Sequence, residues 1–238
     1  METRMTDNLK YTLKRSKRRS MGISVERDGS IIVRAPLRTE IDDIERFVSE
    51  KQVWIYQKLT KKQALNREKP KREFVNGQGF LYLGKSYRLK LIDDAELKSK
   101  KAKNRKALRL WQGYFELLKS ETSKGREHFV CWYKNQLQKQ LKARIPRYDK
   151  RIGVTVNEIR ISDMGHRWAS CGRNGIISFN WRSIMAPIWV FDYILVHEMV
   201  HKIERRHSKK FWRLVSRVIP DYEEHVRWLS EHGADLDL

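Results

Sequence analysis

Three residues in the C-terminal third of the chain have the types and the spacing of a metal site with a catalytic base. His197 and His201 are four residues apart, and Glu198 directly follows the first histidine. A helix turns about 100° per residue, so residues four apart stand on one face and both imidazoles reach a single ion. Glu198, one step round the helix, reaches a water on that ion without being a ligand. The pattern predicts two Zn²⁺ ligands and a general base.

The alternative is an ordinary core helix whose histidines are only hydrogen-bonded. Residues 188–196 form a largely apolar run that leads directly into His197, and a further histidine follows at position 207. An apolar approach and a third histidine both favour a buried metal helix over that alternative.

His207 is the candidate for the third metal ligand. In an unbroken helix it would lie about 240° round from His201 and some 9 Å further along, pointing away from the ion. Ligation therefore requires that the helix ends soon after His201 and that the chain turns back. Ser208, a residue type that caps helices, supports such a break. Otherwise His207 is a surface residue beside Arg205 and Arg206, and the last helix holds the reserve ligands. These are Glu223, Glu224 and His225.

The same histidine spacing occurs in the metzincin proteases, but two of their features are missing. Position 204 is Glu where their pattern has Gly, and no methionine follows Met199 in the chain. A Met-turn cannot form, so the metzincin interpretation fails.

Composition limits the classes of protein that the chain can belong to. It has 238 residues, enough for one large or two small domains, and 51 Lys and Arg against 29 Asp and Glu give a formal net charge of +22. Such a surface attracts polyanions such as nucleic acid or nucleotides, although solubility alone also explains it. No apolar stretch reaches the ~20 residues of a membrane span, and residues 1–20 have no signal-peptide core. Cys131 and Cys171 have no ligand or disulfide spacing, so we expect a cytoplasmic protein.

The remaining sequence predicts a β-rich N-terminal part. Strands flank Asp28-Gly29, a hairpin signal, and an apolar stripe widened by Phe47 and Trp54 predicts a helix over about 40–65. Alternating residues predict strands within 74–92 and 108–118. A Lys-rich segment, 94–107, separates these strands and reads as a loop.

The C-terminal part is predicted to be mainly helical. A helix runs from about Lys124 to Arg144 and is stopped by Pro146. Strands at 154–162 and 176–181 precede the metal helix, and two shorter helices follow Ser208. We therefore predict an α+β fold in two parts. Residues 1–123 form a β-hairpin-rich region with a flanking helix, and residues 124–238 form a helical, zincin-like catalytic domain with a small sheet.

Two aromatic residues are predicted to lie near the metal helix. Tyr193 is four residues before His197 and shares its face, so it is placed to reach the site. Trp168 and Ser170 lie between the two strands, where an edge could hold an extended substrate. For Trp168, packing beneath the metal helix is the favoured alternative.

Residues 168–171, 192–201 and 207–212 read W-A-S-C, D-Y-I-L-V-H-E-M-V-H and H-S-K-K-F-W. Together they resemble the YgjP-like metallopeptidase domain, whose pattern is close to W-G-S-C, D-Y-x-x-x-H-E-x-x-H and N-H-S-x-x-F-W. In the N-terminal half, residues 28–29, 34–36 and 83–89 also fit. The resemblance implies a metal-dependent hydrolase with His197, His201 and His207 as zinc ligands and Glu198 as catalytic base.

The chain departs from that family pattern at two positions and in one segment. Ala169 replaces a Gly, and Arg206 replaces the Asn before the third histidine. Asn tolerates a left-handed turn better than Arg, so Arg206 weakens the prediction of a helix break. The segment 94–107 reads as an insertion.

Peptide hydrolysis is the favoured function, because two histidines and a glutamate on one helix are the protease arrangement. The resemblance also implies an alternative, a nucleotide (UTP-type) pyrophosphatase, which the basic chain would suit. Enzymes of that kind more often hold Mg²⁺ with clustered carboxylates, and the sequence shows no such cluster. A third hypothesis uses the basic surface, including residues 98–106, in a DNA-associated protease or a nucleic-acid-binding protein with structural zinc. The expected partners are therefore a peptide, protein or nucleotide substrate, with nucleic acid as a further option and no membrane.

Overall fold

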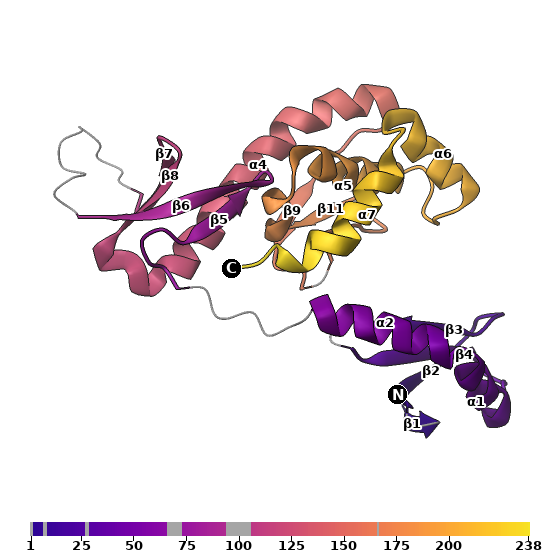
Figure 1. Ribbon diagram of the computed structural model, residues 1–238. Helices are drawn as coiled ribbons and strands as arrows, with labels where there is room; N and C mark the ends of the chain where they lie inside the picture. The colour runs from indigo at the N-terminus through magenta and orange to yellow at the C-terminus, as the bar shows by residue number, and fades with distance from the viewer. Residues whose placement is uncertain (1, 7–8, 27–28, 66–72, 94–105, 166) are drawn as a thin grey trace. The chain divides into compact units, whose positions relative to one another are not determined.

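The computed structural model describes residues 2–6, 9–26, 29–65, 73–93, 106–165 and 167–238 (Figure 1). Mixed sheets and helices make an α+β fold, as predicted. The chain forms two compact units, Met1–Pro70 and Lys71–Leu238. The division therefore falls near residue 70 and not at the expected boundary between 123 and 124. Among the described residues, no helix is long and apolar enough to cross a membrane.

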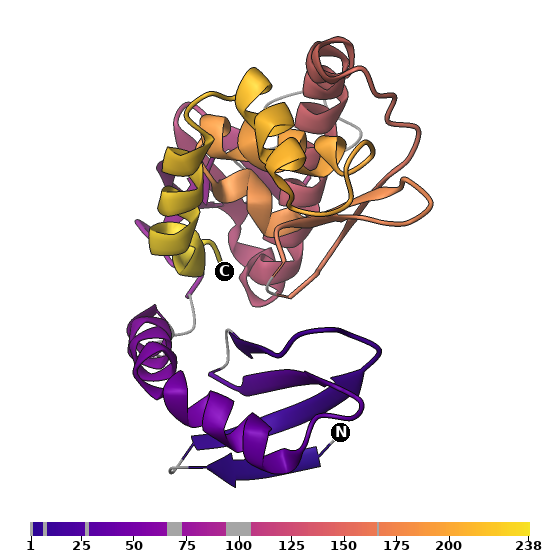
Figure 2. The same cartoon turned by 90° about the vertical axis from the view of Figure 1, so that its right-hand side faces the viewer.

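The first unit is a four-stranded sheet covered on one face by two helices (Figure 2). Its strands lie in the order β1-β2-β4-β3, with β2 and β4 parallel and the outer pairs antiparallel. Alternate residues of β2 and β4 are buried against the helices, as expected for a sheet with one covered face. The elements are β1 (Glu2–Thr6), β2 (Leu9–Ser16), β3 (Gly22–Val25), β4 (Ile31–Pro36), α1 (Ile41–Glu50) and α2 (Gln52–Leu65).

Two predictions for this unit meet different outcomes. The β3–β4 hairpin is confirmed, with Gly29 at φ 85° in its turn, whereas Asp28 lies outside the described residues. The prediction of a single helix over about 40–65 is wrong, because the chain leaves helical geometry at Lys51 and continues as a second helix. Trp54 is 39% exposed, so it does not widen the buried stripe as expected.

The second unit begins with a four-stranded sheet that packs on a long helix. The strands β5 (Gly79–Tyr82), β6 (Lys85–Ile92), β7 (Leu108–Trp111) and β8 (Tyr114–Leu118) lie in the order β5-β6-β8-β7. A short 3₁₀ turn, η1 (Lys119–Lys124), leads into α4 (Gly125–Ile152). The rings of Phe80 and Phe129 stack at 4.0 Å between centroids, and Phe115 packs beside both. Side chains of these strands and of α4 belong to one hydrophobic core, which is why the unit does not divide at residue 123.

Pro146 does not end α4, contrary to the prediction. The helix continues to Ile152 and ends at Gly153, which has the left-handed φ of 77° typical of a C-terminal cap. Pro146 and Lys142 are both exposed, so the backbone carbonyl that loses its hydrogen bond to proline faces water. Buried Ile145 anchors this turn to the core.

A smaller sheet and three helices complete the second unit. The strands β9 (Ile159–Ser162), β10 (Ala169–Cys171) and β11 (Ile177–Asn180) lie in the order β10-β11-β9, so β10 is an edge strand. The later elements are η2 (Trp181–Met185), α5 (Ile188–Val200), α6 (Lys209–Val218), α7 (Tyr222–His232) and η3 (Gly233–Asp235).

Helix α5 is apolar on almost every side, because α4, α6, α7 and β10 all contact it. A charged pair joins α5 to α4: Arg144 Nη1 lies 2.7 Å from both carboxylate oxygens of Asp192. Both side chains are mostly buried, so the pair fixes the position of α5 along α4.

The turn between β5 and β6 docks at the start of α5. The backbone amides of Leu83 and Gly84 donate to the carbonyls of Ile184 and Met185, each at 2.9 Å. Gly84 has φ 79°, and a Cβ at this position would lie 2.8 Å from Pro187 Cα. The β5–β8 sheet therefore contacts the start of α5 through a turn that has no room for a side chain.

We predict that Gly84→Ala destabilises the second unit more than Gly113→Ala does. Gly113 has a similar φ of 84°, but nothing lies within 4 Å of its Cβ position, so it controls for backbone strain. Strain costs about 1–2 kcal/mol in both variants, and the contact with Pro187 adds about 1–3 kcal/mol in Gly84→Ala. Chemical denaturation measures the difference, and equal free energies of unfolding would contradict the docking role.

Candidate metal centre

The break after His201 occurs where ligation by His207 requires it. Helix α5 ends at Val200, with His201 as its C-cap, and the amide of Ile203 donates to the Val200 carbonyl at 2.9 Å. The next helix starts at Lys209, and the Ser208 side chain accepts a hydrogen bond from the Phe211 amide at 3.3 Å. The predicted N-cap at Ser208 is confirmed.

This break brings the three histidines together. One ligand atom from each of His197, His201 and His207 lies within 4.8 Å of the others, and Nε2 of His207 is 3.0 Å from Nε2 of His197. Arg206 does not oppose the turn, since the non-glycine residues with positive φ in the described chain are Leu83 and Gln112. The connection therefore needs no left-handed residue at position 206.

Phe211 forms an apolar floor beneath the histidines. Its ring centroid lies 4.9, 4.6 and 4.8 Å from the rings of His197, His201 and His207, and its side chain is fully buried. Trp212 stacks on His207 at 5.6 Å between centroids. The sequence placed Phe211 in a short helix after Ser208; its contact with all three imidazoles follows from how α6 packs on α5.

Hydrogen bonds orient two of the rings. Nδ1 of His201 lies 3.1 Å from the carbonyl oxygen of Glu204, which can only accept, so Nδ1 carries the proton and Nε2 has a free lone pair. Nδ1 of His197 lies 3.2 Å from the Tyr193 hydroxyl. Tyr193 thus reaches the site, as its spacing predicted, and both contacts leave Nε2 to face the other histidines.

Burial shapes the electrostatics of the site. It lowers the pKa of His197 to about 3, aided by the neighbouring histidines, and lowers the pKa of His201. Burial raises the pKa of Glu198 to about 7, and a hydrogen bond from the Cys171 backbone amide limits that rise. His197 and His201 are therefore neutral, the form that donates a lone pair to a metal.

The histidines open into a pocket of about 370 Å³. Glu198 and the edge strand β10 line it together with three arginines. The lining residues are Arg167, Ala169, Ser170, Cys171, Gly172, Arg173, His197, Glu198, His201, Arg205 and His207. The arginines were not among the residues that the sequence singled out for the site, because nothing in their spacing distinguishes them from the chain's many other basic residues.

The residues present fit a tetrahedral metal ion with an open position. Three imidazoles converge, two of them with Nδ1 already engaged, and each has a nitrogen to offer. Two nitrogens bound tetrahedrally at zinc distances are about 3.4 Å apart, close to the observed 3.0 Å between His197 and His207. Three protein ligands and one open position are typical of catalytic rather than structural zinc sites.

The reserve ligands lie elsewhere in the described structure. Glu223 and Glu224 on α7 are not part of the histidine group. His225 is buried against Trp189, 4.8 Å between ring centroids, and its Nε2 lies 3.6 Å from Asp221.

Trp168 belongs to the packing of the second unit. Its ring contacts Gly233, where an added Cβ would lie 2.9 Å away. Trp168 therefore packs against the start of η3, and it does not line the pocket.

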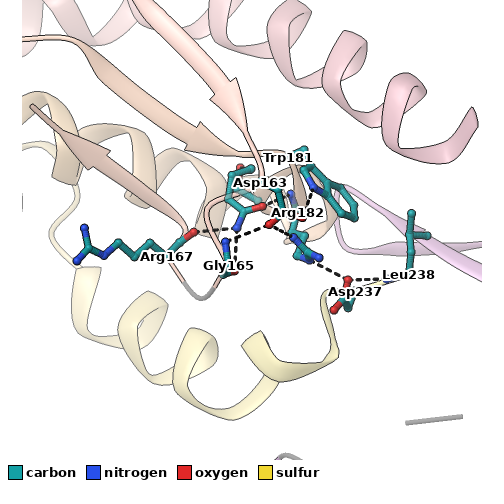
Figure 3. Close-up of polar contacts among 9 residues, drawn as sticks. Asp163, Gly165, Arg167, Trp181, Arg182, Asp237 and Leu238 are labelled. Atoms are coloured by element: carbon teal, nitrogen blue, oxygen red, sulfur yellow. Dashed lines mark hydrogen bonds and ion pairs between the residues drawn. The ribbon is translucent and has the colours of Figure 1, made fainter. Parts of the chain in front are cut away.

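A polar network holds the loop that leads into β10 (Figure 3). Buried Asn180 donates through Nδ2 to the carbonyls of Gly165 and Arg167, at 3.1 and 2.9 Å, and accepts from the Arg182 amide. Arg182 donates to Asp163 and to Asp237, each at 2.8 Å. The network fixes the start of the pocket's edge strand and ties the C-terminal residues to it.

Arg182 is the centre of this network. Its guanidinium lies 4.3 Å from the centre of the Trp181 ring, and the side chain is mostly buried. Partial burial alone would raise the pKa of Asp163, but the hydrogen bond from Arg182 and the backbone amide of Gly165 lower it overall. The charge on Asp163 is therefore stabilised by the folded state.

Comparison with known proteins gives one family and one solved structure. The model of the YgjP-like metallopeptidase domain family matches residues 19–232. The crystal structure of the metallopeptidase zymogen of Pyrococcus abyssi abylysin is 22% identical, over 38% of this chain and 93% of that chain. Its TM-score of 0.36 is too low to support an argument. No curated protein matches the chain.

We predict that Arg182→Met destabilises the second unit by about 1–3 kcal/mol, because it removes charge-assisted hydrogen bonds from a mostly buried side chain. Arg160→Met is the control: Arg160 pairs with Glu158 at 2.8 Å, but both side chains are more than half exposed, so we expect a change below about 0.5 kcal/mol. Urea denaturation compares the variants, and equal effects would contradict the importance of the network.

Proposed function

The chain belongs to the YgjP-like metallopeptidase family, and from that premise we propose that it is a zinc-dependent peptidase. Family membership supports a metal-dependent hydrolase; the ion, its ligands and the base are our proposal. His197, His201 and His207 hold the ion, and Glu198 is the general base. The observation that carries the proposal is the convergence of three imidazoles and a buried carboxylate beside a free sheet edge.

The ligand set favours zinc over magnesium and calcium. Three imidazoles suit zinc, whereas magnesium and calcium prefer oxygen ligands. When bound, a zinc ion supplies Lewis acidity, which polarises a substrate carbonyl and makes water a stronger acid.

Glu198 is placed to move protons. It follows His197 directly and lines the same pocket, while its side chain is largely shielded from solvent. Its carboxylate accepts the proton of the water that attacks the carbonyl carbon and passes that proton to the amide nitrogen as the C–N bond breaks. The Cys171 backbone amide, hydrogen-bonded to this carboxylate, orients it.

Among the described residues no strand pairs with the outer edge of β10, and this edge supports a peptide as the substrate. The Trp168 carbonyl accepts from the Asn180 amide of β11, and the Gly172 amide donates to the carbonyl of Ile176, just before β11. Ser170 pairs with Ser178 between these two bonds. Backbone groups alternate in direction along a strand, so those of Ala169 and Cys171 face away from β11. Because the Cys171 amide points to Glu198, this outer side is the side of the pocket. An extended peptide that adds to β10 would place its backbone beside Glu198 and the histidines.

The alternatives drawn from sequence gain no such support. In the part of the chain that the structure describes, the histidine triad is the one group of three potential ligands, and it contains no carboxylate. A site for magnesium-dependent phosphoanhydride chemistry would need clustered carboxylates. The Lys-rich segment invoked for nucleic acid lies almost wholly outside the described residues.

The first test is metal content. Protein purified without added metal is expected to contain about one zinc per chain by mass spectrometry, and His207→Ala to bind it at least about 100-fold more weakly. His232→Ala removes an imidazole outside the pocket and should leave zinc content unchanged. Full zinc content in His207→Ala would assign the third ligand to another residue, and no zinc in the wild type after reconstitution would refute the metal site.

The second test is Glu198→Gln, which keeps the shape of the side chain and removes the base. We expect normal zinc content with peptide hydrolysis lowered about 10²- to 10⁴-fold. Glu231→Gln, an exposed change on α7, should keep full activity. A fluorogenic peptide library measures hydrolysis, and wild-type rates in Glu198→Gln would exclude this residue as the base.

A further inference from the structure

Arginines surround the pocket at both ends of its edge strand. Arg167 lies two residues before β10, and Arg173 lies two residues after it. Arg205, from the loop after α5, lines the pocket as well. We call these three residues the arginine rim. Glu198 is the only carboxylate among the lining residues, so the described wall of the pocket is strongly cationic.

The arginine rim has no acidic partner within the described residues. The ion pairs recorded there involve other arginines, and all three rim side chains belong to exposed residues. The Arg167 side chain extends away from the Arg182 network, although the Arg167 carbonyl belongs to it (Figure 3). Guanidinium groups that line a pocket and form no ion pair with a carboxylate are available to an anionic ligand.

One end of the rim is held in place. Arg205 Nη2 donates to the Arg173 carbonyl at 2.9 Å, which leaves most of its five N–H donors for a ligand. Lys202 Nζ lies 3.4 Å from the Gly175 carbonyl, in the same loop as Arg173. Arg173, Arg205 and Lys202 thus gather at the C-terminal end of β10, and the latter two follow closely after His201 in the sequence.

The spacing of the rim along β10 determines which part of a bound peptide the arginines can contact. Arg173 lies six positions after Arg167, which corresponds to at most about 20 Å of extended chain. A peptide paired with β10 therefore runs between the two ends of the rim, with its side chains near the scissile bond in reach of a guanidinium.

We infer that the arginine rim is a specificity site for acidic side chains, so that the preferred substrate is an extended peptide with Asp or Glu flanking the cleaved bond. The inference rests on the proposed peptidase function, since it is the pairing with β10 that places these side chains. Arg173 and Arg205 bind the carboxylate at one end, and Arg167 binds one at the other.

Binding without turnover tests this inference. The protein is the zinc-loaded Glu198→Gln variant, and the probes are two fluorescein-labelled octapeptides that differ only in Glu or Gln on either side of a central Ala-Leu bond. We expect the Glu peptide to bind roughly tenfold more tightly, and Arg173→Ala with Arg205→Ala to reduce this preference to roughly threefold, the share that Arg167 supplies at the other end.

A second double variant controls for net charge, since a protein of charge +22 attracts any acidic peptide. Arg213→Ala with Arg217→Ala removes the same two charges from exposed positions of α6 that do not line the pocket, and should keep the preference. Equal binding of the two peptides would overturn the inference, as would an equal loss of preference in both double variants. Rim-dependent binding of UTP in the absence of any peptide preference would also overturn it.

Hydrolysis by the wild type separates this inference from the proposed function. If the Glu peptide binds preferentially through the rim but zinc-loaded wild type cleaves neither peptide, the specificity site stands and the peptidase proposal fails. If both peptides are cleaved at equal rates and bound equally, the peptidase proposal stands and the specificity site fails.

Discussion

The end of α5 at Val200 is the constraint on which the candidate metal centre depends. A helix places His197 and His201 on one face, but it can place no residue six positions later on that face. Because the chain leaves the helix at His201 and restarts at Ser208, His207 returns to within 3.0 Å of His197. The Phe211 floor and the stacking of Trp212 follow from the same turn, since both residues belong to the restarted helix.

The apolar surroundings of α5 give the site its chemical character. The helix is buried by α4, α6, α7 and β10, so the groups at its C-terminal end are shielded from water on most sides. Burial lowers the pKa of His197 and His201 and raises the pKa of Glu198, because charged forms are disfavoured where solvation is poor. A cation held by the imidazoles would favour the charged form of Glu198, the one carboxylate among the residues that line the pocket.

Sequence patterns found most of the elements but misplaced several of their limits. Alternation and helical spacing identified the strands β3 to β9, β11 and the helices around the site, whereas β10 was not predicted as a strand. The extension of α4 past Pro146 was missed. At an exposed position, the carbonyl that proline leaves without its helical hydrogen bond can bond to water instead, and helix propensity alone does not register this. The unit boundary was missed for a related reason: β5–β8 were assigned by position in the chain, while their aromatic side chains pack on α4.

By itself, the sequence determined that His197, Glu198 and His201 occupy one helix turn, because backbone hydrogen bonds between near neighbours fix that geometry whatever surrounds it. It also determined the Ser208 cap, which is equally local. Only the tertiary structure decided that His207 meets the other histidines, that β10 presents a free edge and that three arginines face the pocket. These residues come from separate loops and strands, and their meeting depends on how apolar surfaces pack, which residue spacing does not encode.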